Sequence, residues 1–363
     1  MAAGSAGQDG TLDPQASGPP ARRATMRDVA ALAGVSIKTV SRVVNGSPDV
    51  SAELQQRVWR ASAQLSFHPN LAASSLRRSD GKTRQVALLL EDVANPFSAT
   101  LHRAIEDVAG PRGTLVFAGS LDEDAQRELE LVRASVQHRM DGIIIVPASP
   151  DHGYLHREMH TGTPVVFVDR PPRGLAADAV LCDNVDGAYQ ATAHLVAQGH
   201  RDIAFLGDEW RIHTVVERLE GYERALADHG LPRREEFVVG DLSDSTAAAR
   251  AARELMRLPD PPTALFTGQN LVTMGAIETL QDLGLHKRVA VVGFDDFPTA
   301  DLLDPRVTVV AQDVSRIGTL AIRRLFDRIA GDTSPVREER VPPRLIVRGS
   351  GELPPDGGRR GER

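Results

Sequence analysis

The sequence predicts two connected parts: an N-terminal all-α helix-turn-helix domain, and a larger α/β domain of two lobes, each a doubly wound parallel sheet. Three observations carry this prediction. Two short amphipathic helix patterns separated by a glycine follow a low-complexity N-terminal stretch. From residue 84 onward, apolar runs alternate with helix-length segments. The net charge also differs between the two parts. Residues 25–79 hold seven Lys or Arg and three Asp or Glu, whereas the whole 363-residue chain has a formal net charge of −7.

Composition sets the boundaries of these parts. Residues 1–24 are rich in Ala, Gly, Pro and Ser and are predicted to form a disordered tail. The helix-turn-helix domain is expected over 25–68, a connecting segment over 69–83 and the α/β domain over 84–350. A second disordered tail is expected over 351–363. A small basic domain beside a large acidic one favours nucleic acid as the partner of the small domain.

The segment after residue 24 has the signals of a capped helix. Thr25, followed three residues later by Asp28, resembles a capping box. Apolar residues then recur with the three-four spacing of one helix face. Gly34 is expected to end this helix, because glycine adopts a positive φ at the lowest cost.

The next segment predicts a second helix with a polar outer face. Ser36 can cap it, and Val40 and Val43 form its inward side. The outward side chains are Ile37, Lys38, Thr39, Ser41 and Arg42. A methyl-bearing surface, hydroxyls and two cations suit the reading of base edges and the binding of phosphates in the major groove.

An ordinary helical hairpin with a solvated face is the alternative to DNA readout. A third amphipathic segment follows, with one apolar face made by Leu54, Val58, Ala61 and Leu65. This segment completes a three-helix domain. Together with the local positive charge, it favours the DNA-binding interpretation over the hairpin.

The connecting segment, residues 69–83, has two interpretations. Pro69 breaks the preceding helix, and Asn70 can cap a short helix with the sequence "LAASSL". A helix of this length is marginal in water, so the segment is either a flexible linker or a helix that folds against DNA. The residues alone favour the linker.

Polar side chains follow the apolar runs of the α/β domain. Ligands of doubly wound folds bind at the carboxyl ends of the strands, so these side chains are candidate ligand contacts. They are Asp92, Asn95, Phe97, Asp169, Arg170, Gln269, Asn270, Asp295 and Asp296. Carboxylates, amides, an arginine and an aromatic ring suit a polyhydroxylated ligand. Each residue alone is explained as well by a turn or a helix cap, and only their recurrence at strand ends favours a site.

Motifs of catalysis and cofactor binding are missing from the sequence. It contains no G-x-G-x-x-G, P-loop, G-x-S-x-G, H-E-x-x-H or C-x-x-C motif, so neither an enzyme, a cofactor nor a metal site is expected. Cys182 is expected to be a buried small hydrophobe. His194 and His200 are expected to face solvent or to cap a helix. One cysteine, no long apolar run and no signal peptide favour a cytoplasmic protein without membrane contact.

Motifs along roughly residues 25–350 resemble the lactose-repressor (LacI) family of transcription regulators. They are "MRDVAALAGVSIKTVSRVVNG", "SFHPNLAASSLR", "DVANPF", "VVFVDR", "CDNVDGA", "HLVAQGHRDIAFLG", "RLEGYERAL" and "VVGFDDFPTADLLDP". The resemblance implies a nucleoid-associated homodimer that binds a pseudo-palindromic operator on double-stranded DNA, usually as a repressor. It also implies a periplasmic-binding-protein-like effector domain. Lobe 1 is then expected over about 84–182 and 314–340, and lobe 2 over about 183–313 and 341–350.

The resemblance assigns DNA contacts in both the helix-turn-helix domain and the connecting segment. The recognition positions correspond to Ile37, Lys38 and Arg42. The connecting segment matches the family's hinge helix, which enters the minor groove, with Leu76 in the place of the inserted wedge. The expected DNA-binding residues are Thr25, Ser36, Ile37, Lys38, Thr39, Ser41, Arg42, Asn45, Asn70, Ala73 and Leu76. The resemblance therefore favours the hinge helix over the linker.

The resemblance also assigns effector contacts in the large domain. These are Asn95, Phe97, Asp169, Arg170, Arg218, Gln269 and Asp295. Many family members have Asn-Asp where this chain has Gln269 and Asn270, so this contact is expected to differ. A sugar is the favoured effector, because an acidic, amide-rich cleft suits hydroxyl groups. The alternatives are a purine-like corepressor stacked on Phe97, and a sugar-binding protein without DNA readout.

Overall fold

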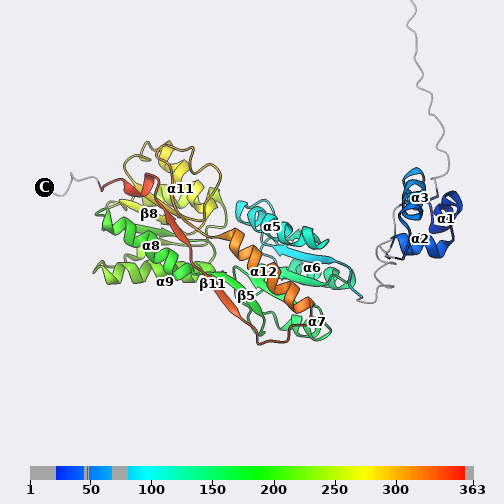
Figure 1. Cartoon of the computed structure of the whole chain (residues 1–363). Coiled ribbons are helices and arrows are strands. Elements are labelled where there is room, and N and C mark those ends of the chain that lie inside the picture. The colour runs from blue at the N-terminus through cyan, green and yellow to red at the C-terminus, as the bar shows by residue number, and fades with distance from the viewer. Residues whose placement is uncertain (1–21, 45–46, 48, 68–80, 356–363) are drawn as a thin grey trace, which may run out of the picture. The chain divides into compact units, whose positions relative to one another are not determined.

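The structure, a computed structural model, describes residues 22–44, 47, 49–67 and 81–355. The chain divides into two compact units, Met1–Thr83 and Arg84–Arg363. Figure 1 shows helices in the first unit and α/β lobes in the second. The predicted hinge helix lies outside the described residues, and so do four of the expected DNA contacts: Asn45, Asn70, Ala73 and Leu76.

The first unit is a helix-turn-helix domain completed by a third helix. Its helices are α1 (Met26–Ala33), α2 (Ile37–Val44) and α3 (Ala52–Gln64). The predicted capping box is present: Thr25 Oγ1 accepts the Asp28 amide, and the Asp28 carboxylate accepts the Thr25 amide at 2.7 Å. Gly34 ends α1 with a φ of 64°, as predicted. Each helix places one fully buried valine in the shared core: Val29, Val40 and Val58.

Lobe 1 of the second unit contains a six-stranded parallel sheet. Its strands, in spatial order, are β11 (Glu338–Val341), β5 (Asp178–Cys182), β4 (Val165–Val168), β3 (Gly142–Ile145), β1 (Gln85–Leu90) and β2 (Leu115–Ser120). Its helices are α5 (Pro96–Ala109), η1 (Gly110–Arg112), α6 (Ala125–Gln137), η2 (Gly153–Leu155), α7 (His156–His160) and α12 (Val314–Ile329). Neighbouring residues of β1 face opposite sides, so Leu88 packs with α5 and α12 while Leu89 packs with α6. Both faces are covered, which explains the uninterrupted apolar sequence of β1.

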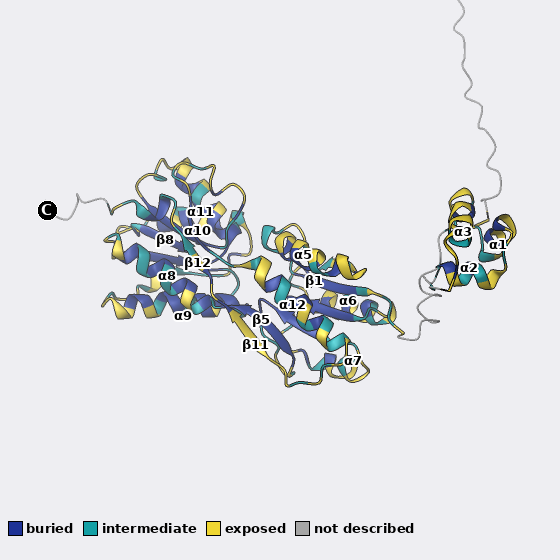
Figure 2. Ribbon diagram, in the orientation of Figure 1, coloured by how far each residue is buried: buried dark blue, intermediate teal, exposed yellow. Residues whose placement is uncertain are grey.

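Lobe 2 has the same architecture with one antiparallel edge strand. Its strands, in spatial order, are β12 (Arg344–Ile346), β10 (Thr308–Ala311), β9 (Ala290–Phe294), β8 (Ala264–Thr267), β6 (Ile203–Leu206) and β7 (Val238–Val239), of which β12 is antiparallel to β10. Its helices are α8 (Asn184–Ala197), α9 (His213–Asp228), η3 (Glu235–Phe237), α10 (Ser245–Leu255) and α11 (Asn270–Asp282). Helices α8 and α9 cover one face of the sheet, while α10 and α11 cover the other. Figure 2 shows the central strands of both lobes buried, while the edge strand β11 and the outer helix surfaces are exposed.

The C-terminal segment departs from the sequence prediction. A tail was expected from residue 351, but Ser350–Glu352 forms the short helix η4 against lobe 2. Ser350 Oγ donates to the Val291 carbonyl, and Glu352 accepts from the Thr308 hydroxyl, so polar contacts and burial hold this segment in place. The Leu353 carbonyl bonds a ring nitrogen of His200.

The two histidine expectations are corrected by the same contacts. His200 is fully buried between Thr263 and Leu353, so it does not face solvent. Burial lowers its pKa and favours the neutral imidazole. His194 is hydrogen-bonded to Glu352 rather than free in solvent. Cys182 is fully buried among apolar side chains, as predicted.

Close packing of α8 against α9 leads to a stability prediction. A Cβ atom on Gly221 would lie 2.2 Å from the Val185 carbonyl oxygen, so Gly221→Ala forces the two helices apart. We expect the free energy of unfolding to fall by roughly 1–3 kcal/mol. Gly110→Ala is the matched control, because its Cβ meets no atom within 4 Å and its φ is negative. Urea unfolding of both variants measures the difference, and equal stability would contradict the predicted clash.

Candidate functional site

The outer face of α2 is the candidate DNA-binding face. Ile37, Lys38 and Arg42 are exposed on it, while Val40 and Val43 turn into the core. Thr39 and Ser41 are half-buried at its edges. Within the described residues, neither Lys38 nor Arg42 takes part in an ion pair. Both cations are therefore available to phosphates or base edges.

Two of the predicted DNA contacts also have structural roles at helix ends. Ser36 Oγ accepts the Thr39 amide at 3.0 Å and lies 2.9 Å from the Thr39 hydroxyl, so it caps α2. Thr25 belongs to the capping box of α1. Their hydroxyls therefore fix the start of each helix, whatever contact they make with DNA.

The candidate effector site is a cavity of about 40 Å³ between the two lobes. Except for Arg218, which lies in the second turn of α9, its polar and aromatic lining residues come from the carboxyl ends of strands and from the loops and helix starts that follow. They are Glu91, Asn95, Phe97, Asp169, Arg170, Asp208, Thr214, Arg218, Gln269, Asn270, Asp295 and Gln312, with Ile212 and Val215 as apolar members. All seven predicted effector contacts lie in this set. Polar groups from opposite lobes thus meet in one place.

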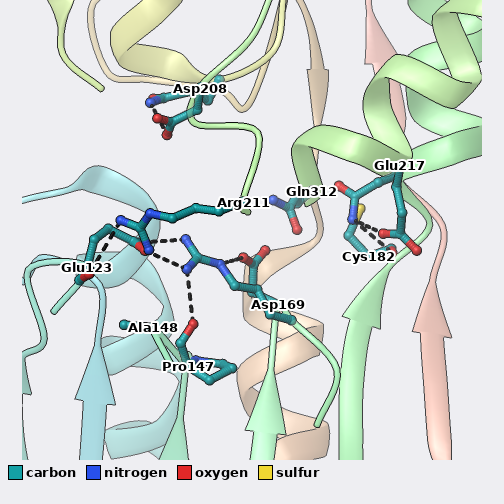
Figure 3. Close-up of polar contacts among 12 residues, drawn as sticks. Glu123, Pro147, Ala148, Asp169, Cys182, Asp208, Arg211, Glu217 and Gln312 are labelled. Carbon is teal, nitrogen blue, oxygen red and sulfur yellow. Dashed lines mark hydrogen bonds and ion pairs between the residues drawn. The ribbon is translucent and has the colours of Figure 1, made fainter. Parts of the chain in front are cut away.

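Lobe 1 contributes a buried arginine and carboxylate after β4. Arg170 donates two hydrogen bonds to the Glu123 carboxylate, at 2.6 and 2.9 Å, and one to the Pro147 carbonyl at 3.0 Å. Its Nε lies 3.7 Å from Asp169 Oδ2. Figure 3 shows this arrangement, with Arg211 reaching the same Glu123 from lobe 2. Burial raises the pKa of Asp169, opposed by the positive charges of Arg170 and Arg218.

Lobe 2 contributes a second buried arginine, Arg218 of α9. Its guanidinium donates to Asn184 Oδ1 at 2.9 Å and to the Gly268 carbonyl at 2.6 Å, and it stacks 3.8 Å from the centre of the Phe294 ring. It also lies 3.4 Å from Asp295 Oδ2. These contacts fix its position at the inner end of the cleft.

The adjacent carboxylates after β9 point in different directions, as expected for neighbouring residues at a strand end. Asp295 faces the cleft and accepts from Gln312 Nε2 at 2.8 Å. Asp296 turns away and accepts from Arg348 of lobe 2. The two are therefore not arranged as an acid/base pair.

The residues of the Gln269-Asn270 pair have separate roles. Gln269 Oε1 caps α11 by accepting the Leu271 amide, and its Nε2 donates to Asp208. Asn270 Nδ2 donates to Asn95 Oδ1 of lobe 1 at 3.0 Å. This hydrogen bond therefore joins lobe 1 directly to lobe 2 across the cleft.

Sequence reasoning missed Glu91, Asp208 and Gln312, which also line the cavity. Each directly follows a strand or lies one residue beyond it, so the rule used for the other candidates would have found them. Burial raises the pKa of Glu91 to about 7, with further upward contributions from Glu123, Asp169 and Asp208 and an opposing effect of Arg170. The Glu91 carboxyl therefore titrates near neutral pH. Burial likewise raises the pKa of Asp208.

A second cavity, of about 370 Å³, adjoins the first and shares Phe97, Asp295 and Gln312 with it. The Phe97 ring therefore lies at the boundary of the two spaces. Among the lining residues of the smaller cavity, Phe97 is the one aromatic side chain. It can cover one face of a ligand ring but not both.

Comparisons with known proteins place this arrangement in a family. Residues 25–70 match bacterial regulatory proteins of the lacI family, and residues 192–351 match a periplasmic binding protein-like domain. Over 331 residues the chain is 31% identical to the HTH-type transcriptional repressor PurR of Erwinia tasmaniensis, covering 90% of this chain and 96% of that protein. The chain belongs to the lacI family. It is a DNA-binding transcription regulator with an effector domain.

Solved structures support the lacI-family fold across both units. The transcriptional regulator CelR in complex with cellobiose is 32% identical, has a TM-score of 0.66, and covers 90% of this chain and 100% of that one. The lac repressor dimer bound to operator and the anti-inducer ONPF is 24% identical, has a TM-score of 0.79, and covers 91% and 99%. The predicted fold class, a helix-turn-helix domain joined to a two-lobed α/β domain, is confirmed.

Two further observations concern other classes of site and partner. Across the described ranges, no helix has the length and apolar character needed to cross a membrane. In the same ranges, no cluster of three His, Cys, Asp or Glu side chains is arranged to hold a metal ion.

Proposed function

We propose that this lacI-family member is a repressor that binds a pseudo-palindromic operator as a homodimer and that a sugar bound between its lobes sets its operator affinity. The lac repressor of known structure is a dimer bound to operator, and the CelR structure holds cellobiose. The observation that carries the proposal for this chain is its cleft, where the predicted effector residues of both lobes meet. On this proposal the protein is cytoplasmic, associates with the nucleoid and has no catalytic role.

The DNA half of the proposal rests on α2. Lys38 and Arg42 supply charge, and Ile37 supplies an apolar surface suited to a thymine methyl group or a sugar. The expected DNA contacts Thr25, Ser36, Thr39 and Ser41 surround them, and Asn45, Asn70, Ala73 and Leu76 are proposed to extend the interface. Pairing two such faces by dimer symmetry explains a pseudo-palindromic operator.

The effector half rests on the composition of the cleft. The seven proposed contacts offer carboxylates, amides and two arginines, groups that bond sugar hydroxyls, while Phe97 covers one apolar sugar face. A purine-like corepressor fits less well, because a planar base is held best between two rings and the cavity lining offers one. Effector binding across the lobes then changes operator affinity through the coupling of the two sites.

Selection from a pool of random duplex DNA tests the DNA half. We expect the full-length protein to enrich a palindrome, and Lys38→Ala/Arg42→Ala to lose that enrichment. In titrations on the selected site, removing two phosphate contacts should reduce the slope of log affinity against log salt by about 2. Arg316→Ala/Arg323→Ala on α12 is the matched control, because it removes the same charge from exposed positions of the effector domain. Equal loss in both variants would show a general charge effect and refute readout by α2.

A further inference from the structure

Among the described residues that line the cavity, the buried side-chain atoms without a hydrogen-bond partner are two amide oxygens and one donor, Arg170 Nε. Asn95 Oδ1 accepts both the Phe97 amide and Asn270 Nδ2, each at 3.0 Å. This fixes the orientation of the Asn270 amide, whose Oδ1 is buried without a partner in the described part of the chain. Asn270 is 1% exposed and lines the cavity. Gln312 Oε1 is likewise buried without such a partner. The orientation of its amide group is fixed, because Gln312 Nε2 donates to Asp295. A ligand that satisfies these two oxygens must bring donors.

Two carboxylates of the cavity, one from each lobe, form no salt bridge with a cation in the part of the chain that the structure describes. Glu91 follows β1 in lobe 1, and its carboxylate makes no hydrogen bond or ion pair with another described residue. Asp208 follows β6 in lobe 2 and accepts from the Glu209 amide and from Gln269 Nε2, both uncharged donors. The negative charge of Asp208 contributes to the raised pKa of Glu91, which is consistent with their both lining the small cavity.

The arginines of the cleft form their salt bridges with other carboxylates, although the positive charge of Arg170 lowers the pKa of both Glu91 and Asp208, against the raising effect of burial. Arg170 is held by two bonds to Glu123, a carboxylate outside the cavity lining. Arg218 is held by Asn184, the Gly268 carbonyl and Asp295. Four carboxylates line the cavity against these two cations: Glu91, Asp169, Asp208 and Asp295. The cavity therefore favours a positively charged occupant over a neutral or anionic one.

We propose, building on the effector role proposed above, that the effector is a polyhydroxylated primary amine, such as an amino sugar, whose ammonium group lies between Glu91 and Asp208. The ammonium group has three donors and no acceptor, so it can bond both carboxylates. Ligand hydroxyls donate to Asn270 Oδ1 and Gln312 Oε1, and Phe97 covers the ring. Because Glu91 and Asp208 belong to different lobes, the ammonium group holds the cleft closed and gives the effector a differential affinity for that form.

Calorimetric titration of the full-length protein at pH 7 with matched sugars tests this inference. The probes are D-glucosamine, D-galactosamine and D-mannosamine, each beside its neutral parent hexose and its N-acetyl derivative. We expect at least one amine to bind about tenfold or more tightly than both of its neutral counterparts, because a charge-assisted hydrogen bond is lost in each of them.

Variants of Glu91 and Asp208 test whether these two residues cause the preference for the amine over the neutral sugars. Glu91→Gln and Asp208→Asn are each expected to reduce the ratio of amine to parent affinity to near one, while Glu220→Gln, an exposed site on α9, leaves it unchanged. Retained binding to the selected operator shows that each variant is folded. If parent hexoses bind as tightly as the amines, the inference is overturned while the sugar-effector proposal stands. If none of the nine sugars binds the folded protein, both are overturned.

Discussion

Replacing Arg218 by alanine is expected to abolish the response of operator binding to effector while operator binding itself persists. The Arg218 guanidinium is buried and organises Asn184, the Gly268 carbonyl and Asp295 at the inner end of the cleft. Its removal leaves Asp295 without its cation and deprives a ligand hydroxyl of a charged donor. We expect effector affinity to fall by about 100-fold or more, as for loss of a buried charged hydrogen-bonding group.

The control for this variant lies on the same helix. Arg224→Ala removes an exposed arginine of α9, whose contacts are Asp228 at 4.0 Å and the Tyr189 ring. Fluorescence anisotropy on the selected operator, with and without sugar, separates the two sites. Circular dichroism at the assay temperature shows whether Arg218→Ala is folded. A folded Arg218→Ala protein that keeps its full effector response would contradict the assignment of this cleft.

Glu91→Gln is expected to stabilise the protein at high pH and to leave its stability nearly unchanged at low pH. Burial, with smaller contributions from Glu123, Asp169 and Asp208 and an opposing effect of Arg170, raises the pKa of Glu91 from 4.5 to about 7 in total. Between these two values, the folded protein holds a proton that the unfolded chain has released. Stability therefore falls as pH rises through this window, and the cost is complete above about pH 7.

The size of this effect follows from the same pKa difference. Glutamine carries no charge at any pH, so we expect a gain of roughly 1–3 kcal/mol in the free energy of unfolding at pH 8 and almost none at pH 4.5. Urea unfolding at both pH values measures this change in the free energy of unfolding. Glu220→Gln, at an exposed position of α9, is the control. A gain of the same size at both pH values would show that burial of the charged Glu91 carboxylate is not its cause.

Local sequence signals account for most of the fold. The capping box at Thr25 and the glycine turn at Gly34 formed where their residue types predicted. Alternating apolar runs became the two sheets, because strands covered on both faces need apolar residues throughout. The antiparallel strand β12 and the helix η4 were missed, since their placement depends on long-range contacts such as Thr308 with Glu352 rather than on periodicity.

The same distinction holds within the cleft. Six of the seven effector contacts were found because parallel strands bring their carboxyl ends to one edge. The seventh, Arg218 of α9, was assigned by the family resemblance. The bond between Asn95 and Asn270, and the presence of Glu91 and Asp208 in the lining of one cavity, depend on how the lobes meet. No local sequence pattern in either lobe predicts these contacts between the lobes. The charge balance of the cleft could therefore be worked out from the folded structure but not from the sequence.

The most direct test of an effector-controlled repressor is a measurement of reciprocal coupling. The affinity for the selected operator is titrated with no sugar and at saturating sugar, and the affinity for that sugar is titrated with and without operator. If the cleft controls DNA binding, the two affinities change by the same factor, about 5-fold to 150-fold for a typical coupling. Sugar affinity that is the same with and without bound operator would contradict the account, because the two sites would then be independent.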